Sequence, residues 1–349
     1  MTDLTADRDS IRSRLLLTRE QMIRWAPLFV LAFLVLLFPV FEWLEDFREG
    51  KDHIYLLDSR FFSSRNASRI AVAATPALMV AIGVTFIIIM GSIDLSMEGN
   101  VSVSAVIFAF VFIGLGGTLA SWAWLALPAA LLVGAAIGFI NGLIHVRLQI
   151  PSFMASLAMG FVGTGFALLL TGGDRIRVED ELFRSLLTTR WLNFPIMCYV
   201  ALAALFVAWF IQSRTTLGRN FYAVGGGEEL AQSSGLNVAR VRIMGFTLAG
   251  VFFALGALMA VGRIGIAETA TGNNFMFISI TAVVVGGTAL WGGIGGVWNT
   301  LVGVLIVNAI NNGMVVIGLP NWLQDGVLGM LVIVAVVLST NRKSISFVK

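Results

Sequence analysis

Residues 216–242 read TLGRNFYAVGGGEELAQSSGLNVARVR and form the only long polar interruption in the second half of a strongly apolar chain. The glycines at 225–227 are predicted to break the chain, and the two glutamates at 228–229 place negative charge in the first turn of a short helix. Gly235 is predicted to end that helix. We therefore expect a short lateral helix on a membrane surface. It is either a connecting loop that happens to be helical or a helix that docks into a partner driving the membrane part.

The composition predicts an integral membrane protein. Of its 349 residues, 58% are hydrophobic and 12% are charged, and the mean hydropathy is +0.89. Apolar runs of about 20 residues suit spanning helices, whereas barrel strands would alternate in polarity, so we predict an all-α, polytopic protein. The single cysteine, Cys198, excludes an internal disulfide. A net charge of +3 without a basic, aromatic-rich run argues against nucleic acid as a partner and leaves membrane lipid as the surroundings.

The apolar runs predict about ten spans, some of them broken or re-entrant. They are residues 23–41, 70–90, 101–119, 122–144, 151–170, 196–211, 243–261, 275–290, 297–317 and 322–338. Pro76 is expected to kink or break the second span. We therefore predict a cytoplasmic segment at 1–22, one transmembrane domain at 23–340 and a cytoplasmic tail at 341–349.

Loop charge predicts the orientation, because short loops rich in Lys and Arg stay in the cytoplasm. With the N-terminus inside, the inner segments carry a net charge of +5 and the outer segments a net charge of −2. Both termini and the loop at 213–242 are therefore assigned to the cytoplasm.

The sequence lacks the motifs of ATP hydrolysis, metal binding and nucleophilic catalysis. A Walker A motif is absent, since Gly50 and Lys51 are followed by Asp52, so the chain is not predicted to hydrolyse ATP itself. His53 and His145 are isolated, which gives no support for a metal site. With no GxSxG motif either, we expect a protein that is not an enzyme and binds no cofactor of its own.

Asp94, in the motif GSIDLS, is the one acid placed at the end of a glycine-broken span. Burying an unpaired acid in a membrane is costly, so such a residue is a candidate for contact with a transported solute. The alternative is structural, because Asp94 or Ser96 could cap a helix that starts near Glu98.

Neutral polar side chains gather in the apolar runs. They are Asn141, Asn273, Asn274, Asn299, Asn308, Asn311 and Asn312, with Thr281 and Thr288 nearby. Neutral hydrogen-bonding groups suit a polyhydroxylated solute better than an ion. We take Asn141, Asn308, Asn311, Asn312 and Thr288 with Asp94 as candidates for a translocation path. The alternative is that these groups only join helices to one another.

Five motifs in order resemble one family. They are GVTFIIIMGSIDLS (83–96), GAAIGFINGLI (134–144), TLGRNFYAVGGGEELAQSSGLNV (216–238), AVVVGGTALWGGIGG (282–296) and INNGM (310–314). Together they resemble the permease subunits of bacterial ATP-binding-cassette importers of the ribose, xylose and arabinose type. The resemblance covers roughly residues 62–338. The family pattern differs at Ser92, Gly227, Glu229 and Leu230.

The resemblance implies partners and a place in the cell. It implies a pair of permease subunits, identical or different, with two ATPase subunits that carry ATP and magnesium and a periplasmic sugar-binding protein. It places the chain in the bacterial inner membrane as a multi-pass protein. It also implies that the loop at 213–242 couples the permease to the ATPase, and the coupling candidates are Gly218, Arg219, Ala223, Gly225, Gly226, Glu228, Glu229, Leu230 and Gly235.

Two functions from different classes follow. The first is an importer permease that moves a monosaccharide or similar polyhydroxylated solute by alternating access. The second is a secondary transporter or channel for a small neutral solute that needs no ATPase. The scarcity of acids within the spans argues against coupling to protons or sodium, and the glycine-broken spans argue against a passive scaffold. The sequence leaves the solute open.

The predicted orientation can be tested by cysteine labelling. A thiol reagent that does not cross the membrane should modify a cysteine placed at Arg184 and should leave one at Gln232 unmodified, because the two loops are assigned to opposite sides. The reverse labelling pattern would contradict the orientation.

Overall fold

A computed structural model describes residues 60–320 without a gap, together with residues 27, 29, 31–33, 36–44, 47, 322–324, 326, 327, 329, 330 and 333. Seven helices in this described part are long and apolar enough to cross a membrane. The all-α, polytopic prediction is confirmed, and the count of ten spans stays a prediction. The segments 1–22 and 341–349, and most of the last expected span, lie outside the described residues.

The seven long segments are α2 (Ser64–Ile89), α3 (Met97–Gly114), η3 (Trp122–Leu125) running into α4 (Ala126–Arg147), α5 (Ser152–Thr171), α7 (Ile196–Arg214), α10 (Val238–Ile264) and α12 (Val297–Val316). The shorter helices are η2 (Arg60–Phe62), α6 (Glu181–Thr188), α8 (Thr216–Gly226), α9 (Glu228–Ser233), η4 (Thr269–Gly272) and α11 (Phe275–Val285). Two antiparallel pairs of two-residue strands join β1 (Ile176–Arg177) to β4 (Ile266–Ala267) and β2 (Arg190–Trp191) to β3 (Phe194–Pro195).

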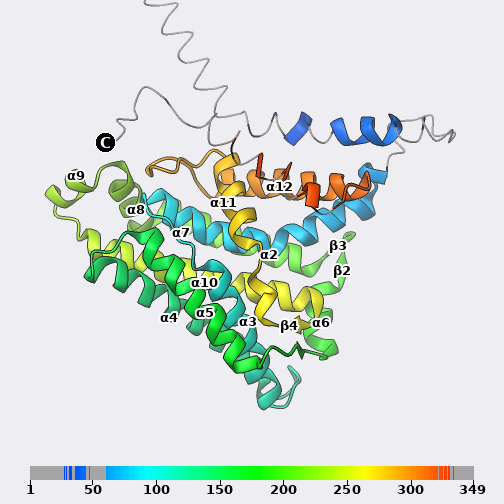
Figure 1. The fold of residues 1–349 in the computed structure, drawn as a ribbon, viewed down its shortest axis with the longest axis horizontal. Coiled ribbons are helices and arrows are strands. Elements are labelled where there is room, and N and C mark those ends of the chain that lie inside the picture. The colour runs from blue at the N-terminus through cyan, green and yellow to red at the C-terminus, as the bar shows by residue number, and fades with distance from the viewer. Residues whose placement is uncertain are drawn as a thin grey trace, which may run out of the picture.

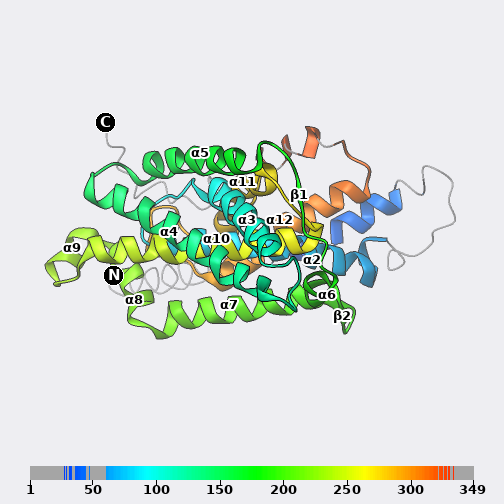
Figure 2. The same ribbon diagram turned by 90° about the horizontal axis from the view of Figure 1, so that it is seen from below.

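The long helices run between two ends of the molecule. Figures 1 and 2 both place α8 and α9 at one end and α6 with β2 at the other. We call these the α9 end and the α6 end. Arg184 lies in α6 and Gln232 in α9, so the labelling test above compares opposite ends of the bundle.

Two spans, α2 and α10, form the centre of the bundle. The most apolar stretch of α2 is 89% buried and those of α10 and α3 are each 67% buried, whereas those of α4, α5 and α7 are each less than a third buried. Small residues permit the closest approach. A Cβ at Gly134 of α4 would overlap the backbone of α10 at Gly250, and a Cβ at Gly250 would overlap Gly134. Glycine packing of this kind replaces the hydrophobic effect as the source of helix association within a membrane.

The second span does not end at Pro76. Proline lacks the N–H that would bond to the carbonyl of Val72, but the hydroxyl of Thr75 donates to that carbonyl at 3.0 Å. The neighbouring side chain therefore satisfies the free acceptor, and α2 continues as a helix to Ile89.

The expected span at 275–290 is shorter than predicted. Its helix, α11, ends at Val285, and a turn at 286–296 follows in which Gly287, Gly292, Gly293 and Gly295 all have positive φ. These conformations favour glycine and cannot continue a helix. The turn reverses the chain into α12 and brings it against the end of α2.

Candidate functional site

The loop predicted at 213–242 is largely helical. Thr215 separates α7 from α8, and its side chain accepts a hydrogen bond from the N–H of Gly218 at 3.2 Å. The expected break at three glycines is wrong for two of them, because Gly225 and Gly226 lie in α8 and only Gly227 separates α8 from α9. Glycine costs a helix about 1 kcal/mol relative to alanine, so its presence there calls for a packing reason.

The helix α9 presents an exposed face and is anchored to the bundle beneath it. Leu230 is 74% exposed, whereas Ala231 is buried. Arg242, in α10, forms an ion pair with Glu228 at 2.7 Å. After Ser233 the chain turns at Gly235, whose φ is +84°, as expected for the end of this helix. Leu230 therefore projects from α9 away from the bundle.

A cavity of about 820 Å³ lies beside α9. It is lined by the turn between α4 and α5, by α9, and by the start of α10, with His145, Gln149, Glu228, Gln232 and Arg242 among its polar groups. The span that was expected to end at residue 144 continues as α4 through His145 to Arg147. The Nδ1 of His145 lies 2.6 Å from the carbonyl oxygen of Ile150, so His145 holds the turn that forms one wall of the cavity.

Gly225 explains why glycine occurs within α8. A Cβ at this position would overlap the carbonyl oxygen of Ile89, the last residue of α2. The same carbonyl accepts a hydrogen bond from the N–H of Gly293 at 2.9 Å. The end of α2, the helix α8 and the turn at 286–296 therefore meet backbone to backbone. We call this contact among Ile89, Gly225 and Gly293 the glycine junction.

Tyr222 makes a second connection between α8 and the same turn. Its hydroxyl donates to the carbonyl of Gly295 at 2.6 Å and is bonded to the side-chain amide of Gln212. Burial raises the pKa of the Tyr222 phenol, so it stays protonated and remains a donor at neutral pH. Gln212 also accepts from the N–H of Val297 at 2.9 Å, which caps the start of α12.

The structure divides the predicted coupling residues into two groups. Those with exposed side chains or backbone are Arg219, Ala223, Gly226, Glu228, Glu229, Leu230 and Gly235. Gly218 and Gly225 instead lie where a side chain would strike backbone, at the corner between α7 and α8 and at the glycine junction. The first group is available to a partner, and the second fixes the loop on the bundle.

Asp94 lies in the extended break between α2 and α3 and is buried. Its Oδ1 accepts from the backbone N–H of Ser96 at 2.7 Å and from the Ser96 hydroxyl at 2.6 Å. Asn141 approaches both side chains at 3.4 Å. The structure thus brings together two of the predicted path residues, while Asp94 Oδ2 and Asn141 Oδ1 have no hydrogen-bond partner among the described residues.

The other path candidates lie apart from this pair. Thr288 is buried in the glycine turn, where its hydroxyl accepts from Gly296 N–H at 3.4 Å. Three lie on α12: Asn308 bonds to its own helix at Val304, Asn312 accepts from Asn66 of α2 at 2.8 Å, and Asn311 is half-buried. Asn312 thus joins two helices, which is the alternative role considered for these amides.

Some residues that bond to the backbone where helices are interrupted were not predicted from the sequence. Ser152 and Ser156 of α5 accept from the N–H groups of Ile93 and Leu95, at 3.0 and 2.9 Å. Glu98 of α3 accepts from the N–H of Met276 in the first turn of α11 at 3.3 Å. Irregular backbone at membrane depth needs such partners. Two serines four residues apart in an apolar span are the signal that could have revealed the first pair.

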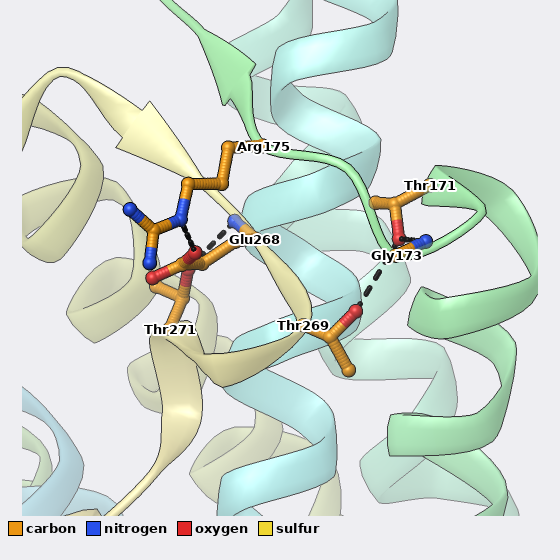
Figure 3. Close-up of polar contacts among 6 residues, drawn as sticks. All are labelled: Thr171, Gly173, Arg175, Glu268, Thr269 and Thr271. Carbon is orange, nitrogen blue, oxygen red and sulfur yellow. Dashed lines mark hydrogen bonds and ion pairs between the residues drawn. The ribbon is translucent and has the colours of Figure 1, made fainter.

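The α6 end is closed by polar contacts between segments far apart in the sequence (Figure 3). Arg175 forms an ion pair with Glu268 at 2.7 Å beside the β1–β4 pairing. The hydroxyls of Thr171 and Thr269 lie 3.3 Å apart. The Arg175 side chain is 71% exposed, so the ion pair contributes at most about 1 kcal/mol. These contacts link the end of α5 to the segment that follows α10.

Asp180 orders the neighbouring loop. Burial would raise the pKa of its carboxyl group, but hydrogen bonds from the N–H groups of Leu119 and Phe183 outweigh that effect and lower the pKa. The two bonds measure 3.0 and 3.1 Å. Asp180 thereby caps α6 and ties it to the loop after α3.

Comparison with known proteins defines the class. Residues 66–336 match the family described as the branched-chain amino acid transport system / permease component. The chain belongs to this family of permeases, which confirms the resemblance noted in its motifs. No solved structure matches it.

Particular relatives are import permeases. The chain is 30% identical to the ribose import permease protein RbsC of Haemophilus influenzae, over 81% of this chain and 87% of the relative. It is 31% identical to the autoinducer 2 import system permease protein LsrC of Photorhabdus luminescens, over 82% and 85%. It is 32% identical to the galactose/methyl galactoside import permease protein MglC of Haemophilus influenzae, over 81% and 88%.

Adjacent glycines provide a test of the glycine junction. Gly225→Ala should push α8 away from the end of α2, with an overpacking cost of about 1–3 kcal/mol. Gly226→Ala is the matched control, because nothing lies within 4 Å of a Cβ at that position. The temperature at which the purified chain unfolds should fall in the first variant and stay unchanged in the second. Equal behaviour of the two variants would contradict the assigned contact.

Proposed function

We propose that this chain is the permease subunit of an ATP-binding-cassette importer that moves a monosaccharide or a similar polyhydroxylated solute by alternating access. Membership of the permease family and the sugar import permeases among its relatives support this function. Two copies, or one copy and a different permease, would work with two ATPase subunits that bind ATP and magnesium and with a periplasmic sugar-binding protein. Both termini and α9 would lie on the cytoplasmic side of the inner membrane.

The observation that carries the proposal is the attachment of an exposed helix to the centre of the bundle. Leu230 is available to a partner, while the Glu228–Arg242 ion pair connects α9 to α10. The preceding helix, α8, contacts the end of α2 through Gly225. Because α2 and α10 are among the most buried spans, a displacement of α9 would act directly on the core.

The importer interpretation also explains how energy reaches the chain. The sequence lacks a Walker A motif, so energy from ATP has to arrive through a protein contact. A rigid docked helix transmits a displacement, whereas a mobile loop would absorb it. A secondary transporter for a small neutral solute would not need this exposed helix, and the relatives named above are import permeases.

We assign different roles to the path candidates. Asp94 and Asn141 would brace the break between α2 and α3, because Asp94 holds the residue that precedes α3. Their two free oxygens would offer acceptors to solute hydroxyls when the bundle opens. Asn311, which is half-buried, would contact solute from α12. Asn308, Asn312 and Thr288 would position backbone and helices.

Replacing Ala231 by proline tests the coupling role of α9. The N–H of Ala231 donates to the carbonyl of Gly227 at 2.9 Å, and proline removes this bond and clashes with that carbonyl, at a cost of about 3 kcal/mol. The spans should remain folded, because α9 lies outside them. We expect the variant to insert normally while ATP hydrolysis loses its response to solute-loaded binding protein and uptake is lost.

Ala231→Ser is the matched control, since it keeps the N–H and adds one small hydroxyl that can bond to the preceding turn. Uptake should be nearly unchanged in this variant. If a purified complex with Ala231→Pro kept full solute-stimulated hydrolysis and uptake, α9 would not be the coupling helix.

A further inference from the structure

The α6 end contains a pocket of about 310 Å³ with three arginines around it. Arg69 comes from α2, Arg190 from β2 and Arg263 from α10. The rest of the lining is formed by two hydroxyl side chains and four apolar ones, namely Ser68, Thr188, Val72, Ala73, Pro195 and Met197. Three separate elements thus each contribute a positively charged side chain to the pocket.

These arginines have no acidic partner in the described part of the chain. The pocket lining contains no Asp or Glu. Other arginines at the same end are paired: Arg175 with Glu268 at 2.7 Å, and Arg177 with Glu179 at 3.8 Å. Like charges around one pocket repel each other, and an anion from outside the chain would offset that repulsion. Arginine suits phosphate in particular, because its planar guanidinium can bond two oxygens at once.

The pocket lies at the level where the spans meet water. Arg69 is in the second turn of α2, and Arg263 is the residue before the last of α10. Arg190 precedes α7 by a few residues. Long basic side chains near the ends of spans reach the lipid headgroups. The pocket is therefore expected at the depth of the lipid phosphate groups, whichever side of the membrane the α6 end faces.

The neighbouring hairpin has the features of a membrane interface. Trp191 is 62% exposed and Leu192 is 71% exposed at the turn between β2 and β3. The hydroxyl of Tyr199 donates to the carbonyl of Trp191 at 2.8 Å, and the two rings are 5.2 Å apart. Tryptophan and tyrosine are enriched at membrane interfaces. In water, the apolar side chains at this tip would stay exposed, whereas the apolar part of a lipid bilayer would bury them.

Helix α6 adds a second interfacial element next to the pocket. Its sequence is strongly amphipathic, with Phe183 and Leu187 directed to the bundle and Leu182 and Leu186 exposed by 50% and 56%. Such a short lateral helix with exposed leucines is suited to the boundary between headgroups and acyl chains.

We propose that Arg69, Arg190 and Arg263 bind the phosphate of an anionic phospholipid at the α6 end of the bundle. Val72, which is half-buried at the pocket, faces the apolar part of the lipid. The site is independent of the transport function proposed above. A free phosphate ion shares the same chemistry but would not use the apolar side of the pocket.

The test compares two triple variants of the full chain with the wild type. Arg69→Gln with Arg190→Gln and Arg263→Gln removes the pocket charges. Arg65→Gln with Arg177→Gln and Arg184→Gln removes the same charge from the same end and leaves the lining intact. Phosphatidylglycerol is titrated into each detergent-solubilised protein, and bound lipid is measured by native mass spectrometry, with thermal unfolding as a second readout. Inorganic phosphate is titrated in a parallel series.

Each arginine near a lipid phosphate contributes about fivefold to binding. Loss of all three should therefore weaken phosphatidylglycerol binding by about a hundredfold, while the control set changes binding by less than about twofold. The proposal is overturned if both variants bind the lipid equally well, or if inorganic phosphate stabilises the wild type as much as the lipid does. It is also overturned if the pocket variant keeps its lipid but loses contact with the periplasmic binding protein.

Discussion

The backbone contact at the glycine junction fixes α8 against the end of α2, and the proposed coupling depends on it. The carbonyl of Ile89 accepts from Gly293 N–H at 2.9 Å, and Gly225 lies so close that no side chain fits between. Three segments from different parts of the chain therefore meet without side chains to absorb movement. Packed interiors of this kind transmit displacement because they are dense. In the proposed importer, this contact is the route by which α9 acts on α2.

Polar groups elsewhere in the bundle allow the helices to be interrupted at membrane depth. The breaks at 91–96 and before α11 would leave N–H groups without acceptors, and each unsatisfied group in an apolar medium is costly. Ser152, Ser156 and Glu98 supply those acceptors. Helices that are interrupted and yet braced can change their arrangement without unfolding, which alternating access requires. Under the two proposals, the ends of the bundle have separate tasks: protein contact at α9 and lipid contact at α6.

Much of the fold could be predicted from hydropathy, because span length and apolar runs follow directly from the bilayer. The short helix α9 was also predictable, since Glu228, Glu229 and Gly235 are local signals. Contacts over long sequence distances were not. Gly225 was predicted to break the chain. Its actual reason, the close contact with Ile89, cannot be read from the neighbouring residues because Ile89 is distant in the sequence. Pro76 was expected to kink or break α2, because the hydrogen bond from the Thr75 hydroxyl to the free carbonyl depends on a side-chain rotamer. The pairing of Asn312 with Asn66 leaves no mark in either local sequence.

The most direct measurement of the central claim is the distance between spin labels in the assembled importer. Labels at Gln232 in α9, at Ile294 in the glycine turn and at Leu157 in α5 would be placed pairwise in a Cys198→Ala chain and measured without nucleotide and with trapped ATP. If the glycine junction moves as one body with α9, the distance from 232 to 294 stays the same while the distance from 232 to 157 changes. A change between 232 and 294, with 294 fixed relative to 157, would contradict this claim.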